Sequence, residues 1–149
     1  MKRFGFLIAF LLTLGGITGC TIIREVPTAE RQKQPKGAEF DLCRTLIKAF
    51  MKNDAATFVK HVPDEARRTF GVRQFETTRK SVIESVGEPI SFEYVTDLEL
   101  TENITPYIWK IRFKRINEKS GKEFTSEILF KIVVGKLDKK PVMLSFQFL

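Results

Sequence analysis

The chain has 149 residues, of which 43% are hydrophobic and 14 are phenylalanine. This is the length of a single domain, and the hydrophobic content excludes a largely disordered protein. The formal net charge of +7 favours anionic partners, although a solvated, lysine-rich surface has the same composition, and one histidine with two cysteines gives no basis for a metal site.

The first 19 residues have the pattern of an export leader. Lys2 and Arg3 form a short positive region, and residues 4–14 form an apolar run that is too short to span a bilayer comfortably. Small residues then precede Cys20. The segment 17–20, Ile-Thr-Gly-Cys, resembles the bacterial lipobox, with Ile where Leu is more common. An ordinary secretory leader followed by an incidental cysteine is the alternative interpretation.

The lipobox resemblance implies that residues 1–19 are a lipoprotein signal peptide and that Cys20 carries a diacylglycerol and often a third acyl chain. Two or more acyl chains hold a protein stably to a bilayer. Residue Thr21 is not Asp, which in enteric-type sorting favours the outer membrane. We therefore expect a lipid-anchored protein of the bacterial cell envelope, on the outer membrane and facing the periplasm, with no nucleic-acid partner. Residues 20–36, with two prolines and few large apolar side chains, are expected to form the lipidated N-terminus and a flexible tether.

Helical spacing of apolar residues follows the tether. Residues 38–51 predict an amphipathic helix with a broad apolar face. Asp54 is suited to cap a second short helix, and Pro63 to end that helix and open the next turn. A longer helix is expected over 72–86, with Gly87 in the left-handed conformation at its end.

After Gly87 the apolar period changes from about 3.6 to 2, which indicates strands. Turns are expected at 117–121 and 135–140. The sequence therefore predicts an α+β domain over residues 37–149, with the N-terminal helices packed on one face of a four-stranded antiparallel meander. The expected inward positions are Ile90, Phe92, Tyr94, Tyr107, Trp109, Ile111, Phe113, Phe124, Ser126, Ile128, Phe130, Ile132, Val142, Leu144, Phe146 and Phe148.

The register of the middle strands follows from matching their side chains. With Trp109 opposite Phe130, aromatic residues meet on the inner face, and Arg112 meets Glu127 on the outer face. A shift by two residues loses the charge match. We therefore expect Trp109 to be buried and Arg112 to be exposed.

The order of helices followed by a meander, the lead from Gly87 to Ile90 into the first strand and the final apolar strand resemble the cystatin-like, ketosteroid-isomerase-like cone, also called the nuclear transport factor two-like fold. The resemblance covers residues 40–149. It implies a curved sheet around the first long helix, with a pocket at the wide end. Members of this fold include enzymes, binding modules and domains with neither role, so the resemblance supplies no function.

Few residues could carry catalysis. The lone histidine, His61, has no nucleophile or carboxylate at a recognisable spacing and is expected at a helix end or the surface. Cys43 lies on the apolar face of the first helix and is expected to be buried and inert. Basic residues between positions 60 and 80 could face anionic lipid headgroups or form a solvated helix face.

The inward positions from Tyr107 onward contain no Asp, Glu or His. We expect Tyr94, Tyr107, Trp109 and Phe130 to line an apolar pocket, if the cone is open. This inventory favours a non-enzymatic, membrane-anchored binding or structural module without a cofactor, whose partner is an envelope protein or an apolar ligand. The alternative is a small isomerase or hydrolase using the cone pocket, which would need a carboxylate from the helices converging on Tyr94 or Tyr107.

Overall fold

A computed structural model describes residues 34–149. The expectations for the signal peptide, for Cys20 and for most of the tether lie outside these residues. Within the described part of the chain, no helix is long and apolar enough to cross a membrane.

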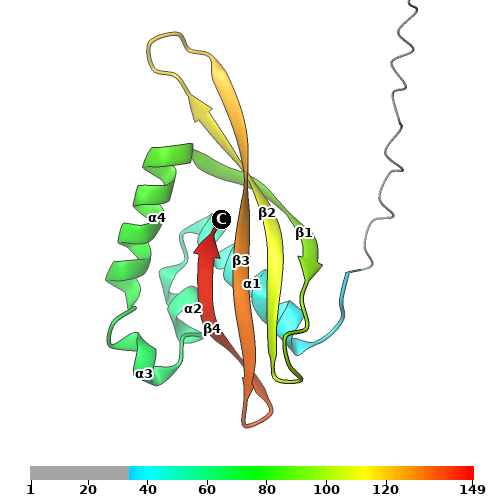
Figure 1. Cartoon of the computed structure of the whole chain (residues 1–149). Coiled ribbons are helices and arrows are strands. Elements are labelled where there is room, and N and C mark those ends of the chain that lie inside the picture. Colours follow the sequence, from blue (N-terminus) through cyan, green and yellow to red (C-terminus); the bar gives the residue numbers. More distant parts are fainter. Residues whose placement is uncertain (1–33) are drawn as a thin grey trace, which may run out of the picture. The chain divides into compact units, whose positions relative to one another are not determined.

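Helices come first in the chain and strands follow, as predicted (Figure 1). Two long helices, α1 and α4, agree with the expected ranges within one residue. The elements are α1 Ala38–Lys52, α2 Ala55–Lys60, α3 Asp64–Arg67, α4 Val72–Val86, β1 Glu88–Asp97, β2 Ile104–Ile116, β3 Glu123–Leu137 and β4 Lys140–Phe148.

The end of α1 is set by local chemistry. Asn53 takes the left-handed conformation, with φ 58°. The next backbone amide, that of Asp54, donates to the carbonyl of Ala49 at 2.8 Å, which satisfies a helix-end carbonyl. The Asp54 carboxylate then accepts the amide of Thr57 at 3.0 Å, so the predicted N-cap of α2 is confirmed.

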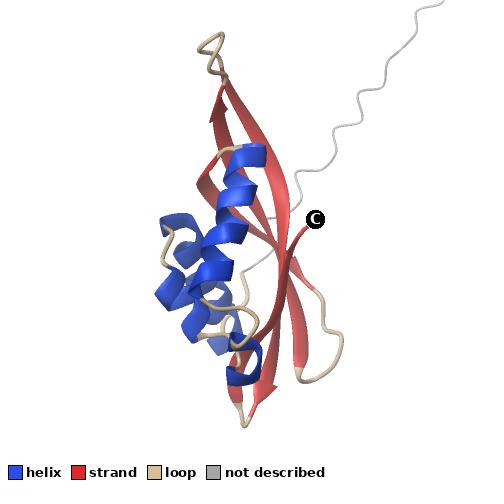
Figure 2. Cartoon of the chain, turned by 90° about the vertical axis from the view of Figure 1, so that its left-hand side faces the viewer, coloured by secondary structure: helices blue, strands red, loops and turns tan. Residues whose placement is uncertain are grey.

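The four strands form one antiparallel sheet in the order β1-β2-β3-β4. All helices lie on the same side of it (Figure 2). The predicted register is confirmed: Trp109 pairs with Phe130, and Arg112 with Glu127. Trp109 is 2% exposed, whereas the Arg112 guanidinium reaches the Glu127 carboxylate at 2.7 Å on the outer face.

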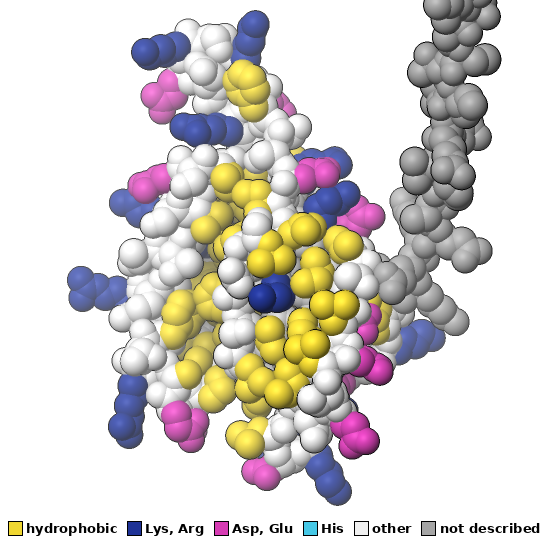
Figure 3. All heavy atoms as spheres, in the orientation of Figure 1, with side chains coloured by type: hydrophobic (Ala, Val, Ile, Leu, Met, Phe, Trp, Pro, Cys, Tyr) yellow, Lys and Arg dark blue, Asp and Glu magenta, His cyan; other side chains and the backbone are white. Residues whose placement is uncertain are grey.

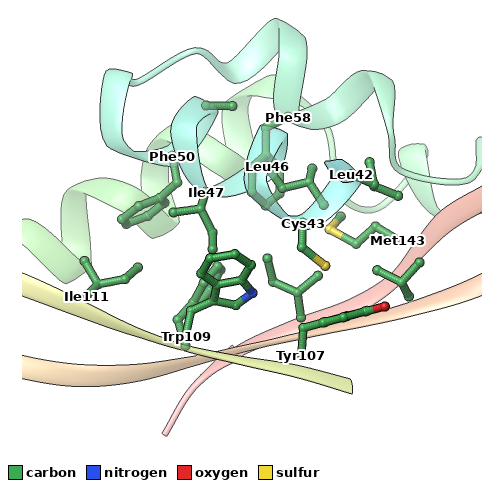
Figure 4. Packing of buried hydrophobic residues seen from close by; sticks show 14 of the residues in the cluster. Leu42, Cys43, Leu46, Ile47, Phe50, Phe58, Tyr107, Trp109, Ile111 and Met143 are labelled. Carbon is green, nitrogen blue, oxygen red and sulfur yellow. The ribbon is translucent and has the colours of Figure 1, made fainter. Parts of the chain in front are cut away.

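The core fills the space between the helices and the inner face of the sheet. Figure 4 shows Cys43 and Ile47 of α1 pointing toward Tyr107 and Trp109. The described residues include no buried charged side chain and no buried polar residue of the Ser, Thr, Asn or Gln type. The buried residues are Phe40, Leu42, Cys43, Leu46, Ile47, Ala49, Phe50, Ala55, Phe58, Val62, Phe75, Tyr94, Tyr107, Trp109, Ile111, Phe113, Phe130, Ile132, Val134 and Met143.

Gly87 joins α4 to β1, but the prediction of a left-handed cap is wrong. Its backbone has φ 100° and ψ −171°, outside the left-handed helical region. The reason is that β1 starts at the next residue, so the chain must turn at once into an extended strand. A Cβ at this position would lie 2.2 Å from the carbonyl oxygen of Lys114 on β2. Only glycine, which has no Cβ, allows the backbone to approach β2 this closely.

β-Bulges change the predicted faces at two places. Register shifts place Ile90 in one bulge and Leu144 in another, and these side chains are 48% exposed each. The extra residue reverses the alternation, so Met143 rather than Leu144 is buried. The inward assignments of Ile90, Val142 and Leu144 were therefore wrong.

The β2–β3 hairpin explains another difference. It extends beyond the helices at one end of the domain (Figure 1). Phe124 and Ser126 are exposed there, although the Ser126 hydroxyl still donates to the carbonyl of Val86, the last residue of α4, at 3.5 Å. The second predicted turn is also shorter than expected: β3 continues to Leu137, and only Asp138 and Lys139 form the turn, both with positive φ.

Both edges of the sheet have irregular features. Edge strand β1 contains Pro89, which has no amide hydrogen, and bulges at Ile90 and Val95. At the other edge, the β4 amide of Met143 donates to the carbonyl of His61, 3.4 Å away at the end of α2. These features interrupt the row of unpaired backbone groups on each edge strand.

The outer face of the sheet has a polar end and an apolar end. At the polar end, the Glu127 carboxylate forms ion pairs with both Lys110, at 3.6 Å, and Arg112. At the other end, Figure 3 shows hydrophobic side chains around a single basic one. By register, Lys131 lies between Ile108 and Gln147, with Leu129 and Val133 next to it on its own strand. Lys131 makes no ion pair with the described residues.

Two of the basic residues between positions 60 and 80 bind backbone carbonyls within the helical part of the domain. Arg79 donates to the carbonyls of Phe50 and Met51, at 2.8 and 3.3 Å, and so completes the end of α1. Arg67 donates to two further backbone carbonyls, those of Val62 and Lys60. These two guanidinium groups join the helices together.

Candidate binding site beside the start of α1

The four residues expected to line an apolar pocket lie together in the core. The ring of Phe40 on α1 lies 5.3 Å from Tyr94, 6.0 Å from Tyr107 and 5.2 Å from Trp109, measured between centroids. The ring of Phe50 lies 6.0 Å from Phe130. Side chains of α1 thus occupy the space in front of the four residues. A binding role for them stays a prediction, and it would require α1 to move.

One polar atom in this region is left without a partner. The indole nitrogen of Trp109 is buried and makes no hydrogen bond to any described residue. Its neighbours include the face of Phe40, which offers no acceptor. The nitrogen contributes nothing favourable to the core, since an unsatisfied buried donor costs about 1–3 kcal/mol.

A hollow of about 620 Å³ opens beside the start of α1, where the β1–β2 loop and the end of β3 also meet. We call it the acidic hollow. Four carboxylates and two lysines border it, with the hydroxyl-bearing side chain of Tyr107: Lys36, Glu39, Asp97, Glu99, Glu102, Tyr107 and Lys136.

Tyr94 donates its hydroxyl hydrogen to the Asp97 carboxylate at the border of the acidic hollow. Burial, followed by this hydrogen bond, raises the pKa of Tyr94 far above its usual value. The phenol therefore stays protonated at neutral pH and holds the carboxylate of Asp97 in place. The pair thus has the phenol of Tyr94 as donor and the carboxylate of Asp97 as acceptor.

Glu39, in the first turn of α1, is bound by Lys136 of β3 at 2.9 Å. This hydrogen bond from Lys136 is the main cause that lowers the pKa of Glu39. A carboxylate with a lowered pKa is a weak base near neutral pH. Glu39 does lie beside Tyr107, as the enzyme alternative requires, but its charge is already neutralised.

Tyr107 connects the acidic hollow with the core. It is 7% exposed, and its hydroxyl makes no hydrogen bond to the described residues. Burial, with smaller contributions from Cys43 and from carboxylates of the hollow, raises its pKa to about 12. The phenol is therefore neutral, with one hydrogen to donate and lone pairs to accept.

The two remaining residues considered for chemistry lie elsewhere. Cys43 is fully buried, as predicted, and burial raises the pKa of its thiol far above the usual range. His61 follows the last residue of α2, and burial lowers its pKa, so its imidazole is neutral at pH 7. Neither residue lines the acidic hollow.

Sequence reasoning missed most of the acidic hollow. Glu39, Asp97 and Lys136 are far apart in the chain, and no short motif connects them. The one part of the hollow that the sequence indicated was Tyr107, because it is the first inward-facing residue of its predicted strand. Two other hollows, of about 580 and 680 Å³, border the β2–β3 hairpin, but no polar side chain that lines them is buried.

No protein-family model matches the chain, and no curated protein matches it. Solved structures do. A ketosteroid isomerase-like protein from Erwinia carotovora atroseptica SCRI1043 is similar with a TM-score of 0.56 and 12% identity, over 74% of this chain and 92% of that one. Aln2 from a Streptomyces species is similar with a TM-score of 0.51 and 11% identity, over 78% and 93%.

A weaker likeness is to an NTF-2 like protein of unknown function from Shewanella oneidensis MR-1, with a TM-score of 0.46 and 14% identity over 72% of this chain and 93% of that one. At these identities the comparisons establish the fold alone. The domain is an α+β cone of the ketosteroid isomerase-like, NTF2-like class, as the sequence predicted.

Proposed function

We propose that this protein is a lipoprotein of the bacterial cell envelope, held to a membrane through Cys20, which acts by binding or scaffolding rather than by catalysis. The proposed anchor rests on the leader and its lipobox-like end. We place the protein on the outer membrane, facing the periplasm, because Thr21 follows the cysteine.

The observation that carries the non-catalytic part is the packing of the cone. The rings of Phe40 and Phe50 occupy the space where an enzyme of this shape would hold a substrate. The nearest carboxylate of α1, Glu39, is bound by Lys136. Side chains therefore fill the middle of the cone, and the hollow that the described residues form lies beside the start of α1.

A surface partner agrees better with this packing than an apolar ligand in the interior. The apolar end of the outer face, around Lys131, leaves Leu129 and Leu144 exposed. Exposed apolar patches of this kind are typical of surfaces that contact other proteins. Another envelope protein is therefore the partner that we favour.

Metabolic labelling tests the anchor. The full chain is expressed in a bacterium with an alkyne-bearing palmitate, and the protein should be labelled and found in the membrane fraction. Cys20→Ser should abolish both the label and the processing of the leader. The matched control is Cys43→Ser, which removes the only other cysteine and should keep the label. Normal labelling of Cys20→Ser would refute the lipoprotein assignment.

One observation favours the alternative of an isomerase or hydrolase: the Tyr94–Asp97 pair and Glu39 border the same hollow as Tyr107. Such a site would have to remove a proton from a substrate. Deuterium exchange at the carbon next to the carbonyl of a cyclic ketone, followed by NMR, tests this. Exchange that the protein accelerates and that Asp97→Asn abolishes would support the enzyme over the binding module.

A further inference from the structure

The acidic hollow has more negative than positive charge. Of its four carboxylates, only Glu39 has an ion pair within the described residues, the one with Lys136. Asp97, Glu99 and Glu102 make no ion pair there, and the only other basic residue on the border is Lys36. The carboxylates thus exceed the lysines by two, so the hollow attracts cations.

Tyr107 gives this acidic cluster a second feature of a binding site. It is more than nine-tenths buried, yet its hydroxyl has no partner among the described residues. The side chain borders the hollow, and the charges of Glu39 and Asp97, which also border it, act on its hydroxyl. The hydroxyl oxygen is not among the buried unpartnered atoms, so it opens onto the hollow, where a bound molecule can reach it.

The carboxylates of the hollow are too far apart for a compact metal ion. Among residues 34–149, no three His, Cys, Asp or Glu side chains come close enough together to hold one. An ammonium group at the end of an alkyl chain suits dispersed acceptors better, because each of its three N–H donors takes one acceptor. The volume of about 620 Å³ is within the range of small-molecule sites.

We propose that the acidic hollow binds an alkylammonium cation with two or more amino groups, either a free linear polyamine or the lysine side chains of a peptide. Asp97, Glu99 and Tyr107 accept from one ammonium group, and Glu102 meets a second. The inference rests on the proposed function of this protein as a binding module. It makes the hollow the place where the module recognises its ligand.

Spermidine titration tests the inference. The protein used is the chain from Gln32 to Leu149, which forms one compact unit and contains every residue of the described core. Isothermal calorimetry at low salt should show one saturable site, and added salt should weaken it because the contacts are ionic. Absence of saturable binding would overturn the proposal.

Two sets of variants separate site binding from general attraction to an acidic surface. Glu99→Gln with Glu102→Gln removes two charges from the hollow and should weaken spermidine binding at least 10-fold. The matched control, Glu76→Gln with Glu118→Gln, removes two charges from exposed positions outside the acidic hollow and should change the affinity less than 2-fold. Equal losses in both double variants would refute a defined site.

Tyr107→Phe removes only the hydroxyl and should weaken binding several-fold without lowering the melting temperature. An unchanged affinity in this variant would contradict the role of Tyr107. A blocked Lys-Lys dipeptide distinguishes the two sources: tighter binding than spermidine identifies a peptide, and weaker binding identifies a free polyamine. Labelling at Cys20 does not involve the hollow, so a failure of spermidine to bind would leave the proposed anchor intact.

Discussion

The indole ring of Trp109 is stacked on the ring of Phe40, with centroids 5.2 Å apart and planes 21° from parallel. This contact joins the start of α1 to the middle of the sheet. Trp109→Ala should therefore lower the free energy of unfolding by about 3–5 kcal/mol, as for other core aromatic residues. Urea melts followed by circular dichroism measure it.

Two controls accompany this prediction. Trp109→Phe keeps an aromatic ring and removes the unpartnered N–H, so it should lose much less stability. Arg112→Ala removes an exposed ion pair with Glu127 and should change the midpoint of the urea melt little. A larger loss from Arg112→Ala than from Trp109→Ala would mean that the two faces of the sheet are assigned the wrong way round.

Arg79→Ala should cost about 1–3 kcal/mol, because it removes the guanidinium donor from the carbonyls of Phe50 and Met51, although Phe50 keeps a 3.3 Å bond from the Asn53 amide. Arg79→Lys should rescue only part of this loss, since an ammonium lacks the planar pair of donors. Thermal melts of both variants provide the measurement. Lys80→Ala, on the next and well exposed residue, is the control and should be nearly neutral.

Gly87→Ala should be strongly destabilising. A positive φ outside the left-handed region costs about 1–3 kcal/mol for other residues, and the added Cβ would also overlap the Lys114 carbonyl. Gly121→Ala is the matched control: its φ is 64°, but no atom lies within 4 Å of the added Cβ, so its cost should be about 1–2 kcal/mol. Equal losses would show that the backbone at Gly87 does not approach the Lys114 carbonyl of β2 as closely as described.

The Glu39–Lys136 pair makes stability depend on pH. Because the pKa of Glu39 is lowered in the folded protein, its contribution is present above the ordinary value of 4.5 and is lost as the pH falls through the folded pKa. Glu39→Gln should therefore flatten the decline in melting temperature below about pH 4.5. Lys136→Met should flatten it similarly. A decline as steep as that of the parent in both variants would contradict the pair.

Cys43 should react slowly with a thiol reagent in the native protein and rapidly in urea, because the thiol is fully buried and its pKa is raised. A chain from Gln32 to Leu149 has no other cysteine, so the reaction reports this position alone. Native labelling as fast as labelling in urea would place α1 with the wrong face toward the sheet.

The sequence was sufficient for the elements and for the central register. Alternating apolar residues and the Arg112–Glu127 charge match define that register, because a one-residue slip turns side chains to the wrong face and a two-residue slip loses the charge match. The bulges at Ile90 and Leu144 were not predictable, since one extra residue in a strand leaves no mark until its partner strand is known. The acidic hollow was missed for a related reason: Glu39 and Lys136 meet only after the helix is laid on the sheet.

The interrupted edges of the sheet bear on how this protein behaves at high local concentration. The proposed lipid anchor would confine the protein to a thin layer, where neighbouring copies meet far more often than in solution. A regular edge strand would there accept another strand and start aggregation. Pro89 and two bulges on β1, and the His61 carbonyl against β4, interrupt the row of free backbone groups on both edges. Crowded copies should therefore pair less readily edge to edge than copies with regular edge strands.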